Sequence, residues 1–527
     1  MLKFKPKSLS KILVIASVLC IAMPVYAIED APQKKSFLSF FKKDKNEVVL
    51  EKTKKKKRTE LKELKLPEVS KTGRPSRNVF VMSIDDCVTY AIEHNPNLQV
   101  SEQRILAAKS GVGQQKANFA PRLTARVGYN HIANNGTRIV NSHQDSIGFS
   151  AGVSQLIWDF GKTWARINMA KYNVLSAQYD YDYDLLNVIY NVRINYYKVL
   201  MALANLDIYE QNVRINTLNF ERTKAMFDEG LKSKIDVVNA EVNLADAKIQ
   251  LVEGQNALET VVIALKNSMY FSENRDFIVE NTENFGFLKA DYRKKFESIE
   301  DIKPANLTFT KNEDGLIMLT SGIQHNDILQ NFQLEPLKIS KQEAVDKALE
   351  ARPDLLSNRM LVNVQEESLK AVRRSYAPEI TGDLTWSYTK NESTYSSPLQ
   401  VGASMGLGSI NPYGIHWQIK EGEAYLDIAN QNVNIAKSDI FWEVQSNWVN
   451  MRQIERRIPL MNSKVKATLE NFELADGRYS VGLNNYVELQ DALANYNNSQ
   501  LNFVEAVFQY NVARETLLKS MGLKYEY

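Results

Sequence analysis

The chain has 527 residues, with 65 Lys and Arg against 62 Asp and Glu and only two cysteines. If the predicted leader described below is removed, Cys87 is the one cysteine left, which excludes an intramolecular disulfide and a cysteine-rich metal site. After residue 27 there is no stretch of about twenty apolar residues, so no membrane-spanning helix is expected in the mature chain. A segment that enters a membrane would have to do so as strands.

The first 27 residues are predicted to be a secretory signal peptide. Four lysines precede an apolar run from Ile12 to Met23, and Val25-Tyr26-Ala27 supplies a small-residue cleavage site. Residues 28–80 are predicted to form a basic disordered arm, because Lys54–Arg58 is an unbroken cationic run and large apolar residues are few. This arm would either contact an anionic surface or serve as a solvated spacer.

The rest of the chain contains a long internal repeat, which predicts two similar structural halves. We place the first repeat at residues 81–269 and the second at 338–527, joined by an equatorial segment at 270–337 in which a small hairpin is expected between 307 and 319. The aligned pairs are Ser83 with Ser340, Ala120-Pro121 with Ala377-Pro378, Gly230-Leu231 with Gly482-Leu483, and Ser268-Met269 with Ser520-Met521.

Each repeat begins with a predicted helix, which in the first repeat runs from Ser83 to about Asn118 and stops at Pro121. Apolar residues then recur with period two, which predicts strands at about 121–132, 145–157, 378–390 and 399–410. Each strand has one apolar and one polar face, and a length of roughly nine to eleven residues suits a tilted membrane strand. A half-buried strand in a soluble sandwich would show the same alternation.

Long helices complete each repeat. Residues 161–228 contain no proline and no internal glycine, and would make about 100 Å of helix, in one piece or in two stacked segments. The helix after Gly230 carries two neighbouring heptad seams, which would give it a neighbour on each side, as in the wall of a cylinder. One seam is Ile235, Val238, Val242, Ala245, Ile249 and Val252, and the other is Val237, Ala240, Leu244, Ala247, Leu251 and Leu258.

Four strands are too few to close a barrel, and an open sheet in lipid would leave edge groups unpaired at several kcal/mol each. Strands placed in a membrane must therefore be shared among symmetry-related copies. Two chains would give eight strands with a largely filled interior, and three would give twelve strands around a pore. The strand count alone does not choose between these two assemblies.

The order and doubled spacing of these motifs resemble the TolC-like outer membrane efflux protein family from about residue 83 to the end. The motifs that carry the resemblance are Asn95-Pro96 and Arg352-Pro353, the two Ala-Pro strand entries, Leu156–Gly161, Phe227–Val237 and Tyr479–Glu488. The resemblance implies a mainly α fold with membrane β, in which each two-repeat helix-strand-strand-helix protomer contributes to a trimeric α-barrel and a 12-stranded outer-membrane β-barrel.

The resemblance further implies a homotrimeric channel-tunnel in outer membrane lipid that extends through the periplasm. It would export substrates handed over by a periplasmic adaptor protein and an inner-membrane pump or ABC exporter, in tripartite efflux or type I secretion. An enzyme activity, a cofactor, a metal and a nucleic-acid partner are not expected. The exported substrate cannot be read from the sequence.

Five residues are implied by the resemblance to act at the periplasmic entrance. Glu488 and Asp491 match an acidic ring that attracts cations, while Asp236, Tyr479 and Asn484 match a network that holds the entrance shut. The family's best-known member has an arginine where this chain has Asn484, so the network is expected to be weaker or differently built. Without the resemblance, ordinary solvated acids near a helix start would be the better explanation of Glu488 and Asp491.

Two other classes of protein share parts of this pattern. A secreted periplasmic or surface coiled-coil scaffold or adhesin without a pore would share the helical seams, and would be soluble without detergent. A hydrolase is suggested only by Gly148–Gly152, which fits the G-x-S-x-G pattern, but that pattern requires a sharp strand-to-helix turn. Here the serine lies within an alternating strand, so small polar residues facing a lumen explain it better.

Overall fold

The structure is a computed structural model, and it describes residues 80–134, 142–271, 277–279, 309–311, 317–319, 337–391, 394–406 and 411–523. All of these belong to the larger of the two units of the chain, Glu63–Tyr527. The predicted signal peptide and residues 28–79 of the predicted basic arm lie outside the described residues, as does the last part of the strand expected at 399–410.

Two repeats of helix and strand elements follow one another, which confirms the predicted fold class. The first repeat consists of α3 (Ile84–His94), α4 (Pro96–Lys116), η1 (Ala117–Phe119), β2 (Arg122–Asn134), β3 (Ser142–Trp158), α5 (Lys162–Asp228) and α6 (Lys234–Ser268). The second consists of α7 (Lys341–Ala351), α8 (Pro353–Arg373), η5 (Arg374–Tyr376), β7 (Glu379–Asn391), β8 (Tyr395–Ser396), β9 (Leu399–Gly406), α9 (Pro412–Ser480) and α10 (Tyr486–Ser520).

The single helix expected from Ser83 to Asn118 is wrong, because the chain breaks it at Asn95-Pro96. Proline lacks the N–H that an interior helical position requires, but it fits the first position of a new helix. The side chain of Asn95 accepts a hydrogen bond from Asn97 N at 2.8 Å and caps α4. The second repeat is divided in the same way at Arg352-Pro353, between α7 and α8.

The helices that follow the strands are continuous. Helix α5 has 67 residues and α9 has 69, so neither is divided into stacked segments. Asp159 caps α5 by accepting a hydrogen bond from Thr163 N at 2.6 Å. Asn411 caps α9 by accepting one from Gly414 N at 3.0 Å, and Pro412 occupies the first helical position.

The main strands form one antiparallel sheet in the order β2-β3-β7-β9, with β8 also paired to β7. Their lengths are 13, 17, 13 and 8 described residues, so three of the four exceed the expected nine to eleven. Within the described residues, the outer edges of β2 and β9 have no strand partner. In the equatorial segment, β5 (Phe309–Lys311) pairs antiparallel with β6 (Ile317–Leu319), which confirms the small hairpin.

One pairing was not anticipated from the sequence. β1 (Phe80–Met82) lies parallel to β4 (Phe277–Val279) and thereby ties the start of the first repeat to the segment that follows it.

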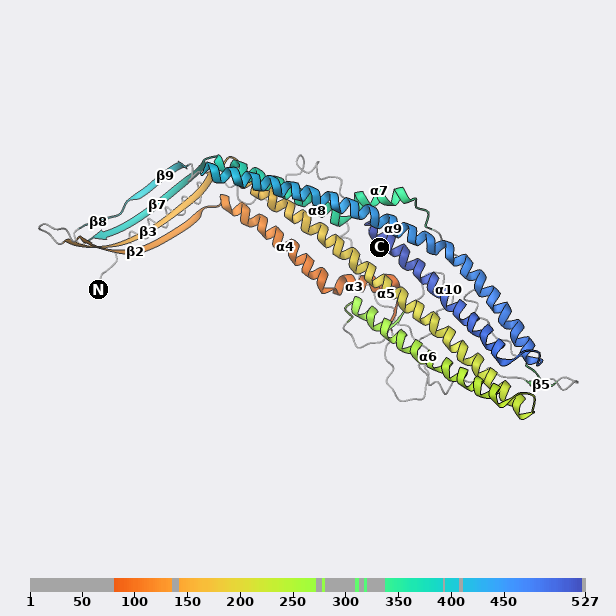
Figure 1. Cartoon of the computed structure of the whole chain (residues 1–527). Helices are drawn as coiled ribbons and strands as arrows, with labels where there is room; N and C mark the ends of the chain where they lie inside the picture. The colour runs from red at the N-terminus through yellow and green to blue at the C-terminus, as the bar shows by residue number, and fades with distance from the viewer. Residues whose placement is uncertain are drawn as a thin grey trace, which may run out of the picture. The chain divides into compact units, whose positions relative to one another are not determined.

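The helices run away from one end of the sheet, and their neighbours change along the way (Figure 1). Near the strands the packed order is α4-α5-α8-α9, and further away it is α6-α5-α10-α9. Helices α5 and α9 therefore belong to both parts, because each is long enough to pass from one to the other. In both parts α9 stands at one edge, while the opposite edge is first α4 and then α6.

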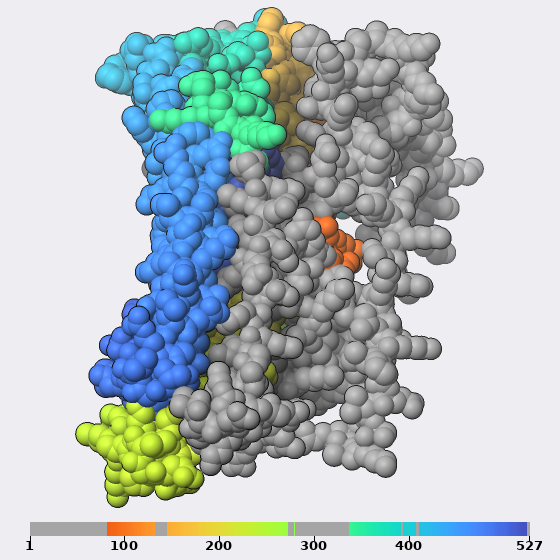
Figure 2. Space-filling model, turned by 90° about the vertical axis from the view of Figure 1, so that its right-hand side faces the viewer, coloured from red at the N-terminus to blue at the C-terminus, as the bar shows by residue number. Residues whose placement is uncertain are grey.

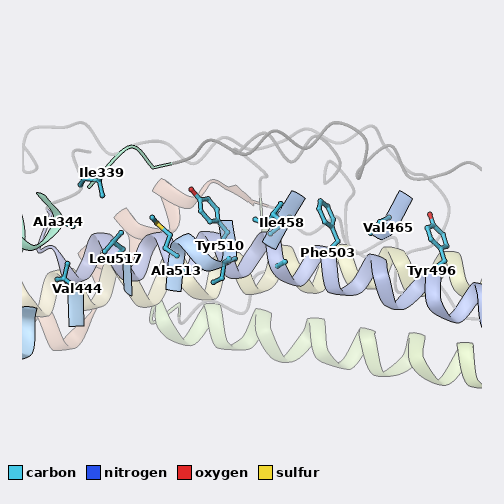
Figure 3. Close-up of a cluster of buried hydrophobic side chains, with 14 of the residues drawn as sticks. Ile339, Ala344, Val444, Ile458, Val465, Tyr496, Phe503, Tyr510, Ala513 and Leu517 are labelled. Atoms are coloured by element: carbon cyan, nitrogen blue, oxygen red, sulfur yellow. The ribbon is translucent and has the colours of Figure 1, made fainter. Parts of the chain in front are cut away.

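Two buried apolar clusters hold these helices together. The first is centred on α5 and includes Tyr196 and Leu206. The second lies between α9 and α10, where side chains such as Ile458, Val465 and Phe503 interlock (Figure 3). Burial of such side chains stabilises a fold by about 1.5–3 kcal/mol each. No helix among the described residues is long and apolar enough to cross a membrane.

Candidate functional site

The two long hairpins, α5–α6 and α9–α10, end in turns of the same backbone form. Gly230 and Gly482 have φ values of +74° and +78°, a conformation that glycine adopts without the Cβ clash of other residues. Both turns form the Schellman pattern of helix ends. The bonds are Gly230 N to Phe227 O and Leu231 N to Met226 O, both 2.8 Å, and Gly482 N to Tyr479 O at 3.1 Å and Leu483 N to Arg478 O at 2.9 Å.

The acidic residues that follow these turns have different roles, although they occupy equivalent positions. The carboxylate of Asp236 accepts hydrogen bonds from Ser233 N at 3.3 Å and Ser233 Oγ at 2.8 Å. Glu488 instead donates its backbone N–H to Asn485 Oδ1 at 2.9 Å. The Glu488 side chain is exposed and makes no hydrogen bond or ion pair with the described part of the chain. Asp236 is thus occupied in capping, and the carboxylate of Glu488 is not.

Asp491 lies one turn after Glu488 on α10 and is also exposed. Residues three apart share a helix face, so the two carboxylates are neighbours. Asp491 likewise has no hydrogen bond or ion pair within the described residues. The structure therefore places the two predicted entrance acids together, beside the hairpin tip and available to solvent.

Tyr479 is fully buried at the base of the second turn. Its hydroxyl lies 2.8 Å from Thr223 Oγ1 on α5, and its ring packs edge-on against Tyr486, with 5.9 Å between centroids. Burial raises the pKa of the Tyr479 phenol above its usual value; the hydrogen bond to Thr223 lowers it, and the Asp236 carboxylate raises it further. Tyr479 is therefore a neutral anchor that joins the two hairpins.

Lys232, in the first turn, reaches the second turn. Its Nζ donates a hydrogen bond to the backbone oxygen of Asn484 at 3.3 Å and lies 4.5 Å from the centre of the Tyr479 ring. Two of the three predicted gating residues, Tyr479 and Asn484, are therefore joined through Lys232. Asp236 influences Tyr479 electrostatically but makes no hydrogen bond to either of them in the described chain.

An ion pair lies one turn deeper. Arg222 on α5 donates from Nη1 to Asp476 Oδ1 on α9 at 2.6 Å, and the arginine side chain is 5% exposed. Arg222 Nε has no partner in the described structure. The Asp476 side chain is 24% exposed, so the pair is partly buried, and breaking it should cost more than breaking a surface pair because the remaining charge is partly desolvated.

Polar side chains continue the contact between the hairpins along α5 and α10. Asn497 Nδ2 donates to Asn212 Oδ1 at 2.7 Å, and Gln490 Nε2 donates to Asn216 Oδ1 at 3.0 Å. These amides are largely enclosed by helices, so each pair satisfies groups that would otherwise be costly to bury. Near the tip, the two hairpins are thus joined by specific polar contacts in addition to apolar packing.

Sequence reasoning missed Lys232, Thr223, Arg222 and Asp476. A signal for Lys232 was present, because it occupies the same repeat position as Asn484, two residues after the turn glycine. The other three lie on helix faces whose neighbours only the packing reveals. No group of residues able to hold a metal ion occurs among the described residues.

A second functional surface is the sheet. One of its faces is apolar over its central rows, as in the row that runs from Leu123 through Val153 and Leu384 to Val401. The edge residues of this row are exposed, Leu123 by 82% and Val401 by 78%. The opposite face carries small and polar residues, as in the row Thr124, Gly152, Thr385 and Gln400.

Aromatic residues gather where the strands meet the helices. Trp158 ends β3 and Phe160 follows it, while Tyr413 and Trp417 lie in the first turns of α9; all four are about half exposed or more. Their rings contact in pairs, with centroids 6.3 Å and 6.1 Å apart respectively. Aromatic belts of this kind are typical of the boundary between a bilayer and water.

Both edges of the helical wall expose apolar stripes. The first seam of α6 is exposed, whereas the second seam faces α5 and is largely buried. On α9 an apolar residue faces outward at every seventh position from Ile428 to Val449, and Figure 2 shows α9, in blue, open along much of its length. The exposed stripe of α6 includes Ile235, Val238, Val242, Ile249 and Val252, and that of α9 includes Ile428, Ile435, Trp442 and Val449.

An apolar sheet face, an aromatic boundary and a helical wall with two open edges define the subunit of a membrane channel. The family model "Outer membrane efflux protein" matches residues 88–269 and 344–523, which is one match in each repeat. The chain belongs to this family and is an outer membrane efflux channel. A coiled-coil scaffold without a pore is therefore not favoured.

Individual relatives agree with this assignment. "Outer membrane protein TolC" of Escherichia coli (strain K12) is 20% identical over 448 residues, which cover 81% of this chain and 80% of that protein. The protein of the same name from Vibrio cholerae is 20% identical over 463 residues, with 84% and 93% covered. The crystal structure of the Campylobacter jejuni CmeC outer membrane channel shares the fold, with a TM-score of 0.64 at 16% identity, and 87% of this chain and 93% of that chain are covered.

Proposed function

We propose that three copies of this chain close into one channel-tunnel, with a shared barrel of strands in the outer membrane and a shared wall of helices in the periplasm. The observation that carries this proposal is the pair of open edges on one protomer. Helices α6 and α9 present exposed apolar stripes at opposite ends of the packed order α6-α5-α10-α9. The sheet ends in the same way, with β2 and β9 at its outer edges.

Two different edges that complement one another form a head-to-tail interface, which becomes a closed ring when the rotation between copies fits. The α9 stripe of one protomer would pack against the α6 stripe of the next, and β9 would pair with the next β2. Three copies would provide twelve strands, enough for an open lumen, whereas eight would leave the interior filled by side chains. The apolar sheet face would contact lipid, and the polar face would line the pore.

The helical end would receive cargo from a periplasmic adaptor and an inner-membrane pump or ABC exporter. The chain would supply the passage and its partner the energy. At the tips, Glu488 and Asp491 from three copies would place six carboxylates around one opening. Such a ring favours cations, because acids held close together create a negative potential at the mouth.

Assembly is tested by native mass spectrometry of the detergent-purified protein. We expect a trimer, and we expect Ile249→Glu to prevent it by placing a charge in the exposed α6 stripe. Lys248→Glu is the matched control, since it alters the neighbouring exposed residue outside the stripe. A stable wild-type monomer in detergent would contradict the proposal.

The entrance is tested by the reversal potential of single channels in planar bilayers under a KCl gradient. Glu488→Gln combined with Asp491→Asn should markedly reduce the preference for potassium. Asp236→Asn, the equivalent position in the first repeat, should change it much less, because that carboxylate is held in a helix cap. Equal changes of the reversal potential in both variants would show that the second-repeat acids have no special role.

A further inference from the structure

We propose that Lys232 is the latch that holds the two hairpin tips of one protomer together, and that its release widens the periplasmic mouth. This inference rests on the proposed channel function and names a gating residue within it. Lys232 lies in the turn between α5 and α6, while its contacts, Asn484 and Tyr479, belong to the α9–α10 hairpin.

The internal repeat explains why the latch is built in this direction. Lys232 and Asn484 each follow their turn glycine by two residues and are equivalent positions of the two repeats. In this chain the cation stands on the first turn and the acceptor on the second. Asn484 occupies the position where the family resemblance implies an arginine. The cation between the tips is instead Lys232, which comes from the opposite hairpin.

The acceptor in the second turn is the backbone and not the side chain. Lys232 Nζ contacts the Asn484 carbonyl oxygen, and the side-chain amide nitrogen of Asn484 is buried without a hydrogen-bond partner in the described structure. A substitution that keeps the backbone should therefore preserve the latch. Asn484→Ala is expected to be nearly silent in gating, although Asn484 occupies the position that the family resemblance singled out.

The surroundings make the latch reversible. Lys232 is half-buried, and the two contacts of its ammonium group are a carbonyl oxygen and the face of an aromatic ring, neither of which carries a full charge. Such contacts are strong enough to favour the joined position of the tips over the separated one. Water can replace both contacts when the tips separate. The partly buried Arg222–Asp476 ion pair lies one turn deeper and would act as the firmer pivot.

The inference is tested on the full-length protein in planar bilayers by single-channel recording. Lys232→Met keeps the length of the side chain and removes its charge. We expect it to raise the ratio of open to shut dwell time by about tenfold, the scale of one charge-assisted contact. Lys232→Arg should stay close to wild type, because the guanidinium group retains the donor and stacks on aromatic rings.

Lys234→Met is the matched control. Lys234 is exposed, lies in the same segment and makes no hydrogen bond or ion pair with the described residues. Loss of its charge changes the local potential equally but leaves the tips joined. If Lys232→Met and Lys234→Met have equal dwell-time ratios, the effect is a general one of charge and the latch is refuted.

Chemical rescue gives a further test on a single protein sample. Lys232→Cys should open the channel, and alkylation with 2-bromoethylamine should close it again, because the thiolate displaces bromide and leaves an aminoethyl thioether of nearly lysine length. Cys87 is fully buried and should not react. Failure of the modified channel to return toward wild type would contradict the latch.

Hydrogen–deuterium exchange separates failure of the latch from failure of the channel. In detergent, Lys232→Met should speed exchange of the tip amides at 229–233 and 481–485, and Lys234→Met should not. Unchanged tip exchange in Lys232→Met overturns the latch even if the channel conducts. A wild-type protein that neither assembles nor conducts overturns the proposed function, and with it the gating role of Lys232.

Discussion

The two hairpin tips share one backbone design but divide its tasks between them. Each turn has a left-handed glycine and the same pair of hydrogen bonds closing the preceding helix. At the position before this turn, the first repeat has Phe227, which is 38% exposed, and the second has Tyr479, which is fully buried. In the following helix, Asp236 caps, while the Glu488 carboxylate has no partner among the described residues.

This difference shows how a duplicated unit becomes asymmetric without a change of fold. The glycine positions fix the path of the chain, because only glycine enters that conformation without strain. The remaining side chains are then free to differ. The second repeat supplies the anchor and the exposed acids, and the first supplies the cation that reaches across.

The largest expected difference between the repeats is in the two aromatic residues before the turns. Tyr479→Ala should lower the free energy of unfolding by about 3–5 kcal/mol, because it empties a fully enclosed site. Phe227→Ala should cost only about 1–2 kcal/mol, since that ring is already partly in water. Denaturant unfolding followed by circular dichroism in detergent measures both. Equal losses would mean that the tips are equivalent.

The next largest effect is expected at the deeper ion pair. Arg222→Met should destabilise the protein by about 1–2 kcal/mol, because the carboxylate of Asp476, which is 24% exposed, then keeps a partly desolvated charge without its partner. Leu474, the equivalent residue of the second repeat, is 58% exposed. Leu474→Met is therefore a control that should change stability by less than about 0.5 kcal/mol. A more stable Arg222→Met variant would show that desolvation outweighs the attraction within the pair.

Alkaline pH should weaken the packing of the second hairpin around Tyr496. Burial raises the pKa of Tyr496 to about 12, with a further increase from Glu473 and a decrease from the hydrogen bond of Gln500. A raised pKa in the folded state means that the neutral phenol is preferred there. The neutral phenol therefore contributes its full stabilisation at pH values below the pKa of tyrosine in the unfolded chain, which is near 10. This stabilisation is lost as the pH rises toward about 12.

The corresponding residue of the first repeat, Leu244, cannot ionise. Tyr496→Phe should therefore reduce the alkaline loss of stability by on the order of 2 kcal/mol between pH 9 and pH 12. Thermal melting of both proteins across this range is the measurement. Identical pH profiles would assign the alkaline loss to other groups.

The smallest effect is expected at the equivalent acids. Asp236→Asn should cost about 0.5–1 kcal/mol, because a charged acceptor at the start of α6 is lost. Glu488→Gln should leave the melting temperature almost unchanged, since its carboxylate has no contact to lose in the described structure. A larger loss for Glu488→Gln would show that this side chain has a structural role in the assembled protein.

Much of the fold could be predicted from the sequence because its signals are local and periodic. Alternation of period two marked the strands, and the heptads of α6 marked two packing faces. The break at Asn95-Pro96 was also visible, yet a single helix was expected there because the pattern on both sides is helical. The continuity of α5 could not be decided, since a helix and two stacked helices have the same local pattern.

The sequence by itself determined the duplication, the two-faced strands, the turn glycines and the positions of the acids, because these follow from residue order and short-range geometry. Only the tertiary structure decided that the second seam of α6 faces its own chain and leaves the first one open. It also decided that Lys232 meets Asn484 and Tyr479, which are about 250 positions away in the sequence. Such contacts depend on how four long helices pack, and no local pattern contains that information.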